Sequence, residues 1–198
     1  MTSASPIALI ENAIVECLRA APRAYTGLTV TSYAGQLDDE LYSWIRTMPA
    51  AWVTFSGAPE YKRISLRSMK VRATFEVLCA QRALDENAGR LNDSTNGADV
   101  GIYKILEDNK LALVNQQLGL KIHPITPGPI RAVVKNMVNR EAVVVYGQEF
   151  STEWTESFEQ EAAVPGGELQ TIGMDFYLKP QHTAPGDPAD KSDLITLT

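Results

Sequence analysis

The sequence predicts an α+β protein in which helices pack on one face of a mainly antiparallel β-sheet. Segments with apolar residues at helical spacing occur between segments that alternate polar and apolar residues, the pattern of a strand with one covered face. Along the chain the elements follow the order α, β, α, β, β, α, β, β, β, which favours such a sheet. A C-terminal β extension and a mobile tail are expected after this domain.

The first expected helix begins at Ser5 and Pro6, an N-cap residue followed by a proline in the first turn, and ends at Pro22. A short strand is expected at 28–33. The acidic residues that open the segment 38–48 suit the positive end of a helix dipole, so a second helix is expected there. The apolar positions of the first helix are Ile7, Ile10, Ile14, Cys17 and Leu18.

Two strands, a loop and a third helix follow. The strand at 51–55 is expected to end at the turn signal 56–59, which contains glycine and proline. The segment 69–79 alternates most regularly and predicts a strand with one buried face. Residues 81–99 are rich in Asn, Asp and Gly and predict a surface loop, and a helix is expected at about 100–113.

The remaining strands are separated by proline-rich segments. Residues 122–129 predict a connector, because proline cannot occupy a central strand. Strands are expected at 130–134, 142–150 and 169–178. From Pro180 onward, prolines and polar residues predict a mobile tail.

These elements divide the chain into an α+β domain at 1–154, an acidic extension with a strand at 155–179 and a proline-rich flexible tail at 180–198. The net charge of −6 is unevenly distributed. Residues 1–140 carry 16 Lys or Arg against 13 Asp or Glu, whereas residues 141–198 carry two against 11. Such an acidic portion repels phosphate, which argues against ordinary nucleic-acid binding, and it equally suits a solvated surface.

The strongest positive patch is the basic run at residues 61–70, with Lys62, Arg63, Arg67 and Lys70. It is interpreted either as a solvated hairpin loop or as a contact surface for an acidic partner. Another copy of the chain fits that partner, because the acidic carboxy-terminal portion complements the basic remainder. Head-to-tail contacts of this kind close into a ring when the rotation allows. These four residues are therefore the candidate inter-subunit contact.

Residue types that carry catalysis or bind cofactors form no recognisable pattern. His123 and His182 have no second Cys or His nearby, so no zinc site is expected. The nucleophile motif Gly-x-Ser-x-Gly does not occur, and the glycines match neither phosphate-binding fingerprint. Cys17 and Cys79 lie on apolar faces, where free buried thiols are expected. The sequence predicts a non-enzymatic protein without catalytic residues, metal, cofactor or bilayer span.

Eight segments carry a family resemblance. They are the helix that starts at Ile7, the short strand after it, the segments 37–48 and 49–55, the strand at 71–79, the helix that starts at Gly101, and the segments 119–125 and 143–150. In this order they resemble the small tail proteins of Mu-like bacteriophages that are placed as tail terminators. The resemblance covers about residues 5–154 and rests on core positions, while the acidic strand and the proline-rich tail depart from the family.

The resemblance implies a virion structural protein that forms a ring, usually a hexamer, at the head-proximal end of the tail tube. There it would stop tube polymerisation and join the tail to the head connector. Its partners would be itself, the tail tube protein and the connector or neck proteins, with assembly in the host cytoplasm and no membrane contact. DNA would pass through the ring without specific binding, and an acidic or neutral bore avoids retaining its phosphates. Glu149, Glu153 and Glu156 are the candidate bore residues.

Two other interpretations stay open. One is a different neck or connector component of the same assembly. The other is a small α+β ligand-binding module or enzyme with an unrecognised pocket. An enzyme would show a concave site that holds titratable groups with shifted pKa values, whereas a tail protein binds only its assembly partners.

Overall fold

The computed structural model describes residues 5–35, 48–83, 90–92, 100–138, 141–158, 171–176 and 191–196. The chain forms two compact units, residues 1–158 and 159–198. The helix expected at 38–48 lies outside the described residues, except for Met48, and so does most of the loop expected at 81–99.

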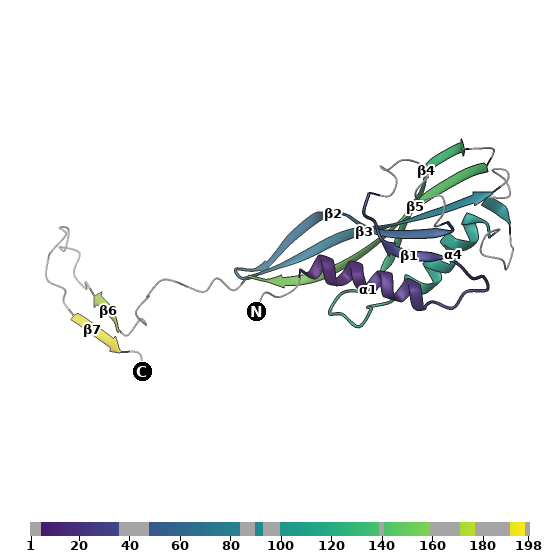
Figure 1. Cartoon of the computed structure of the whole chain (residues 1–198). Helices are drawn as coiled ribbons and strands as arrows, with labels where there is room; N and C mark the ends of the chain where they lie inside the picture. Colours follow the sequence, from purple (N-terminus) through teal and green to yellow (C-terminus); the bar gives the residue numbers. More distant parts are fainter. Residues whose placement is uncertain are drawn as a thin grey trace. The chain divides into compact units, whose positions relative to one another are not determined.

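The first unit combines a five-stranded sheet with the helices α1 and α4 (Figure 1). The strands are arranged in the order β1-β2-β3-β5-β4, and every neighbouring pair is antiparallel except β1 and β2. The expected α+β fold with a mainly antiparallel sheet is therefore confirmed. In chain order the elements are α1 (Pro6–Ala20), β1 (Thr29–Ser32), β2 (Ala50–Ser65), β3 (Ser68–Ala83), α4 (Ile102–Leu113), β4 (Thr126–Val138) and β5 (Glu141–Ser157).

Both helices cover the same face of the sheet, here called the helix face, and the main hydrophobic core lies between them and the strands (Figure 1). The alternation in β3 places Val71, Phe75 and Cys79 on this face, as predicted, and each is at most 1% exposed. Phe75 pairs in register with Phe150 of β5, which is also 1% exposed. The helices contribute Ile10, Ile14, Leu18, Ile102, Ile105 and Leu113.

The two helices begin where the sequence predicts. Ser5 occupies the N-cap of α1, although its side chain forms no capping hydrogen bond. Gly101 occupies the N-cap of α4, and its amide donates to the carbonyl of Asn92 at 2.6 Å. A Cβ at Gly101 would lie 2.6 to 2.8 Å from backbone atoms of Arg90 and Asn92, so only glycine fits this close approach.

Two strands extend through segments for which the sequence predicted other structure. Residues 56–59, predicted as a turn, lie inside β2, where shifts in the register at Gly57 mark β-bulges. Gly57 has a φ of +142°, so the glycine there permits a bulge and not a chain reversal. Residues 126–129, predicted as part of a connector, belong to β4. Pro127 and Pro129 are tolerated because β4 lies at the edge of the sheet.

The strands β2, β3 and β5 continue beyond the helices as a projecting arm (Figure 1). We define the arm as residues 60–70 together with residues 155–158. Between β2 and β3 the chain turns at Leu66 and Arg67, and the amide of Phe158 donates to the Arg67 carbonyl at 2.7 Å. The basic run, predicted as a hairpin loop, therefore lies mostly within strands.

The described part of the second unit is a hairpin. Its strands β6 (Thr171–Phe176) and β7 (Lys191–Thr196) are antiparallel. β6 falls inside the strand expected at 169–178. β7 falls inside the segment predicted as a mobile tail, so residues 191–196 form a paired strand instead. The division of the chain at residues 154 and 179 stays a prediction.

Candidate functional site

The face of the sheet opposite the helices, the outer face, has two parts of different character. Beside β1, an apolar cluster centres on Trp52, which is 2% exposed. Toward the arm the outer face is polar, and most of the residues that the sequence singled out for function lie in this polar part or on the arm. The apolar cluster consists of Met48, Ala50, Trp52, Leu78, Ala80, Val143 and Val145.

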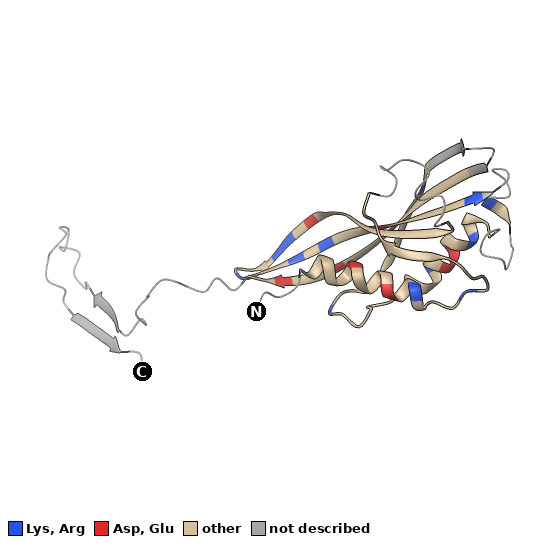
Figure 2. Cartoon of the chain, in the orientation of Figure 1, with Lys and Arg blue, Asp and Glu red and all other residues tan. Residues whose placement is uncertain are grey.

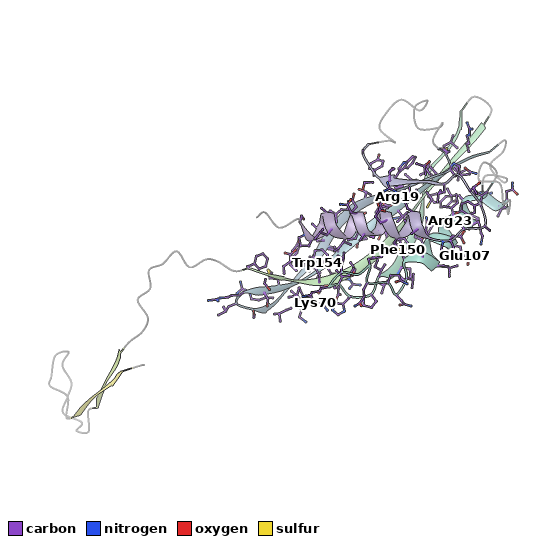
Figure 3. All side chains as sticks on the ribbon, turned by 60° about the horizontal axis from the view of Figure 1, so that its bottom comes forward. Arg19, Arg23, Lys70, Glu107, Phe150 and Trp154 are labelled. Carbon is purple, nitrogen blue, oxygen red and sulfur yellow. The ribbon has the colours of Figure 1, made fainter. Side chains whose placement is uncertain are left out.

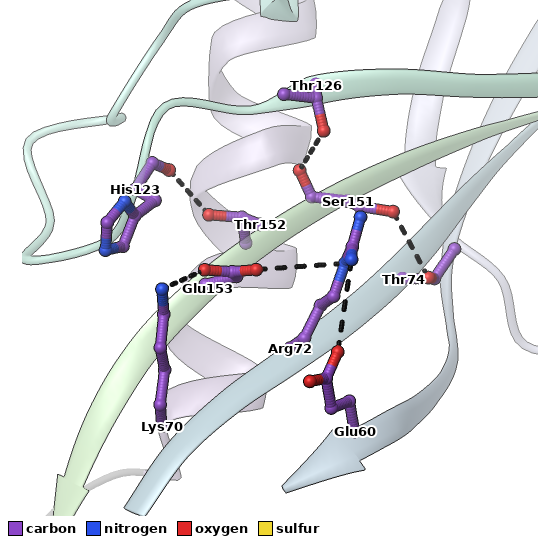
Figure 4. Close-up of polar contacts among 9 residues, drawn as sticks. All are labelled: Glu60, Lys70, Arg72, Thr74, His123, Thr126, Ser151, Thr152 and Glu153. Atoms are coloured by element: carbon purple, nitrogen blue, oxygen red, sulfur yellow. Dashed lines mark hydrogen bonds and ion pairs between the residues drawn. The ribbon is translucent and has the colours of Figure 1, made fainter. Parts of the chain in front are cut away.

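A row of ion pairs crosses three strands of the polar part (Figure 4). Glu60 of β2, Arg72 of β3 and Glu153 of β5 lie side by side in register. Arg72 Nη1 is 4.0 Å from Glu60 Oε2, and Arg72 Nε is 3.8 Å from Glu153 Oε1. The other carboxylate oxygen of Glu153 binds the ammonium group of Lys70. We call these four residues the charge ladder.

The charge ladder changes the protonation of Glu153. The hydrogen bond from Lys70 lowers the pKa of the Glu153 carboxyl from its usual value of 4.5, and the positive charges of Lys70 and Arg72 add to this effect. The Lys70 and Glu153 side chains are 35% and 28% exposed, so water screens their attraction. Such a pair contributes at most about 1 kcal/mol to stability. The charge ladder therefore holds these four side chains in position on the outer face and adds little to the stability of the fold.

A second ion pair joins β4 and β5 on the same face. Glu149 of β5 binds Arg131 of β4. Next to this pair, Thr74 Oγ1 and Ser151 Oγ lie 3.3 Å apart across β3 and β5. The β2 bulge leaves an open hollow of about 530 Å³ here, lined by Ser56, Gly57, Ala58, Pro59, Thr74, Arg131 and Glu149.

The polar part of the outer face carries no net charge. The strand register places four acidic and four basic residues on it, and these balance. The acidic excess of the carboxy-terminal portion is therefore absent from this described surface. The eight residues are Glu60, Glu76, Glu149 and Glu153, with Lys62, Lys70, Arg72 and Arg131.

The structure brings together two of the three acidic residues predicted to line a bore. Glu149 and Glu153 lie on the outer face, and both are ion-paired. Glu156 lies on the helix face, where its carboxylate accepts a hydrogen bond from Trp154 Nε1 at 2.9 Å. The predicted set is thus divided between the two faces of the sheet.

The four residues of the predicted inter-subunit contact are also distributed over more than one surface. Lys62 and Lys70 lie opposite each other on the outer face, whereas Arg63 and Arg67 are exposed at the end of the arm. The ion pair between Lys70 and Glu153 joins two sites that the sequence assigned separately.

An apolar surface that the sequence analysis missed lies at the end of the arm. It consists of Ile64, Leu66 and Phe158, which we call the arm tip. Leu66 is 91% exposed and Ile64 is 57% exposed. The sequence does show two apolar residues, Ile64 and Leu66, inside the basic run. We interpreted this run by its lysines and arginines alone and therefore did not predict an apolar surface.

A second hollow lies between α4 and the edge of the sheet. It has a volume of about 270 Å³ and is lined by Tyr103, Leu106, Glu107, Lys110, Ile130 and Gln148. We call it the α4–β4 groove. Gln148 is 1% exposed, and its Oε1 atom has no hydrogen-bond partner.

Buried polar groups also gather between α1 and α4. Arg23 donates to the carbonyl of Leu18 and, through Nη2, to Asn109 Oδ1 at 2.9 Å. Asn109 Nδ2 in turn donates to Cys79 Sγ at 3.2 Å. Burial raises the pKa of Cys79 to about 12 and that of Tyr25 to about 12. These groups line neither of the two hollows above, and we interpret them as a structural link between the helices.

Within the described residues, no three His, Cys, Asp or Glu side chains are grouped as a metal site would require. Cys17 and Cys79 are both free thiols. None of the helices in the described part of the chain is long and apolar enough to cross a membrane.

The chain matches a known protein family. A family model described as Bacteriophage Mu, Gp37 matches residues 6–155. The match covers nearly all of the first unit and agrees with the resemblance seen over residues 5–154. The general expectation of a Mu-like phage protein is thereby confirmed, while the specific role stays a prediction. No curated protein matches the chain significantly.

Proposed function

Because the chain belongs to the family Bacteriophage Mu, Gp37, and so to the structural proteins of Mu-like phage virions, we propose that it is the tail terminator. In this role six copies form a ring at the head-proximal end of the tail tube. The ring stops tube polymerisation and provides the surface to which the head connector joins.

The observation that carries this proposal is the arm. All residues from Tyr61 to Arg67 are exposed, and they combine apolar and basic side chains. An exposed apolar patch beside polar residues marks a surface that binds another molecule. Since the arm projects from one end of the first unit, its contact with a different surface of the next copy would be head-to-tail. Contacts of this type close into rings when the rotation between neighbouring copies allows it.

We assign the polar part of the outer face to the bore of the ring. Its acidic and basic residues balance, so it would neither retain nor strongly repel the phosphates of passing DNA. In this arrangement Glu149 neutralises the positive charge of Arg131, and Glu153 neutralises that of Lys70 and Arg72.

The role as terminator is tested in a phage from which the gene has been removed. Without the protein, tail tubes should exceed their normal length in electron micrographs, and the wild-type gene supplied in trans should restore normal tails. Tails of normal length that lack heads would instead identify another neck component. Normal virions without the protein would contradict both roles and favour a ligand-binding module or enzyme.

The bore assignment is tested by charge reversal on the two faces. The double variant Glu149→Lys/Glu153→Lys gives the balanced face a net charge of +4. Phage carrying it should assemble normal tails but form about tenfold fewer plaques, because a basic bore retains DNA. The matched control Glu156→Lys, on the helix face, should deliver DNA as wild type does. Equal plaque numbers for both variants would contradict the assignment.

A further inference from the structure

We propose that the arm tip of one copy docks into the α4–β4 groove of a second copy. This inference rests on the proposed ring and adds the two surfaces that meet in it. The arm tip supplies a projecting apolar surface, and the α4–β4 groove supplies a concave one on the body of the first unit, away from the arm.

The arm tip has the composition of an interface centre. Leu66 is almost fully exposed, and Ile64 and Phe158 are 57% and 48% exposed. Basic residues mark this end of the arm in Figure 2. Aromatic and aliphatic anchors that enter a pocket contribute most of the binding energy of an interface, while charges at its rim set orientation and association rate.

The α4–β4 groove offers a matching receptor. Tyr103 and Ile130 on its two sides are 41% and 49% exposed, which leaves apolar surface for a partner to cover. Gln148 Oε1 is a buried acceptor without a donor, and an unsatisfied buried acceptor is costly unless a partner supplies one. The arginines beside the arm tip can supply such a donor. Glu107 on the rim offers them a carboxylate.

The two surfaces are too far apart to meet within one chain. Gln148 and Ser157 are both in β5, nine residues apart, and a strand of that length spans about 30 Å. Figure 3 shows the same separation, with Lys70 toward the arm and Glu107 at the opposite end of the first unit. The arm tip can therefore enter only the α4–β4 groove of another copy, which makes the contact head-to-tail.

The test uses three variants of the full chain: Leu66→Asp in the arm tip, Ile130→Asp in the α4–β4 groove, and the control Leu9→Asp. Leu9 is an exposed leucine of α1 that belongs to neither surface. Sedimentation over a range of concentrations measures self-association, and thermal unfolding followed by circular dichroism verifies that each variant folds. The first two variants should associate at least about 30-fold more weakly than wild type, as expected for central anchors, and the control should not.

Mixing the two defective variants distinguishes this contact from a symmetric one. Leu66→Asp keeps an intact α4–β4 groove and Ile130→Asp keeps an intact arm tip. An equimolar mixture should therefore form dimers through the one remaining contact and nothing larger. A mixture that stays monomeric, although wild type forms rings, would overturn the inference. Rings formed by Leu66→Asp alone would also overturn it, while the proposed ring would stand.

Crosslinking tests the same contact if it forms only weakly in free solution. Oxidation of the double variant Leu66→Cys/Ile130→Cys at high concentration should give a ladder of covalent oligomers, and Leu9→Cys/Ile130→Cys should give none. Absence of the ladder would overturn the docking inference. The tail-length experiment above would then decide the proposed function independently.

Discussion

The body of the first unit and its arm share three strands, yet their surroundings differ completely. In the body, β3 and β5 bury Phe75 and Phe150 beneath the helices. In the arm, every residue from Tyr61 in β2 to Arg67 in the following turn is exposed. The arm is ordered because its strands continue a sheet that is stabilised elsewhere, and not because it has a core of its own. Stability is thus located in the body, and the surface available for assembly is located in the arm.

The largest expected effect compares a core residue of the body with an apolar residue of the arm. Phe150→Ala should destabilise the protein by about 3–5 kcal/mol, because it leaves a cavity among packed side chains. Ile64→Ala, on the arm, should change stability by no more than about 0.5 kcal/mol. Urea unfolding followed by circular dichroism measures both. Similar losses for the two variants would show that the arm contributes to the core after all.

A smaller effect is expected from the buried polar link in the body. Asn109→Ala removes the acceptor for Arg23 and the donor to Cys79, which should cost about 1–3 kcal/mol. The neighbouring control Lys110→Ala lies at the surface and should stay within about 0.5 kcal/mol of wild type. Urea unfolding again measures the difference. If Asn109→Ala left the free energy of unfolding unchanged, water or a rearranged Arg23 side chain would have to replace the lost contacts.

The smallest effect is expected at the charge ladder, where arm and body meet. The pKa of Glu153 is lower in the folded state, so the unfolded chain binds more protons as the pH falls. The stabilisation by the Lys70–Glu153 pair, at most about 1 kcal/mol, should therefore be complete above about pH 5 and disappear as the pH falls below about 4.

This pH dependence is measured as the difference in unfolding free energy between wild type and Glu153→Gln at several pH values. Lys70→Met should abolish the same pH-dependent part, and the double variant should lose little more than either single one. A difference that grows toward low pH would contradict the assigned sign.

Features set by local periodicity were predictable, and those set by long-range pairing were not. The start of α1 at Pro6 and the buried face of 71–79 follow from nearby residues alone. The turn predicted at 56–59 was wrong, because glycine and proline are compatible with both a turn and a bulge, and only the partner strand distinguishes the two. The connector predicted around Pro127 and Pro129 was wrong for a similar reason, since the sequence does not reveal which strand lies at the edge of the sheet, where proline is tolerated.

The candidate site shows the same limit. The sequence pointed to Glu149, Glu153 and Glu156 as one set, because they are close together and acidic. Once β5 is known to extend to Ser157, strand alternation places the first two on one face and Glu156 on the other. The pairing of Lys70 with Glu153 joins residues that are 83 positions apart, and no local pattern predicts it.

By itself, the sequence determined the fold class and the helix-facing side of β3, because both depend on the spacing of apolar residues along the chain, and its match over residues 6–155 determined the family. Only the tertiary structure decided that the basic run forms a projecting arm, that the polar part of the outer face is charge-balanced and that the α4–β4 groove is distant from the arm tip. The reason is register. Which residues meet across a sheet depends on how distant strands align, and a shift of one residue moves every side chain to the other face.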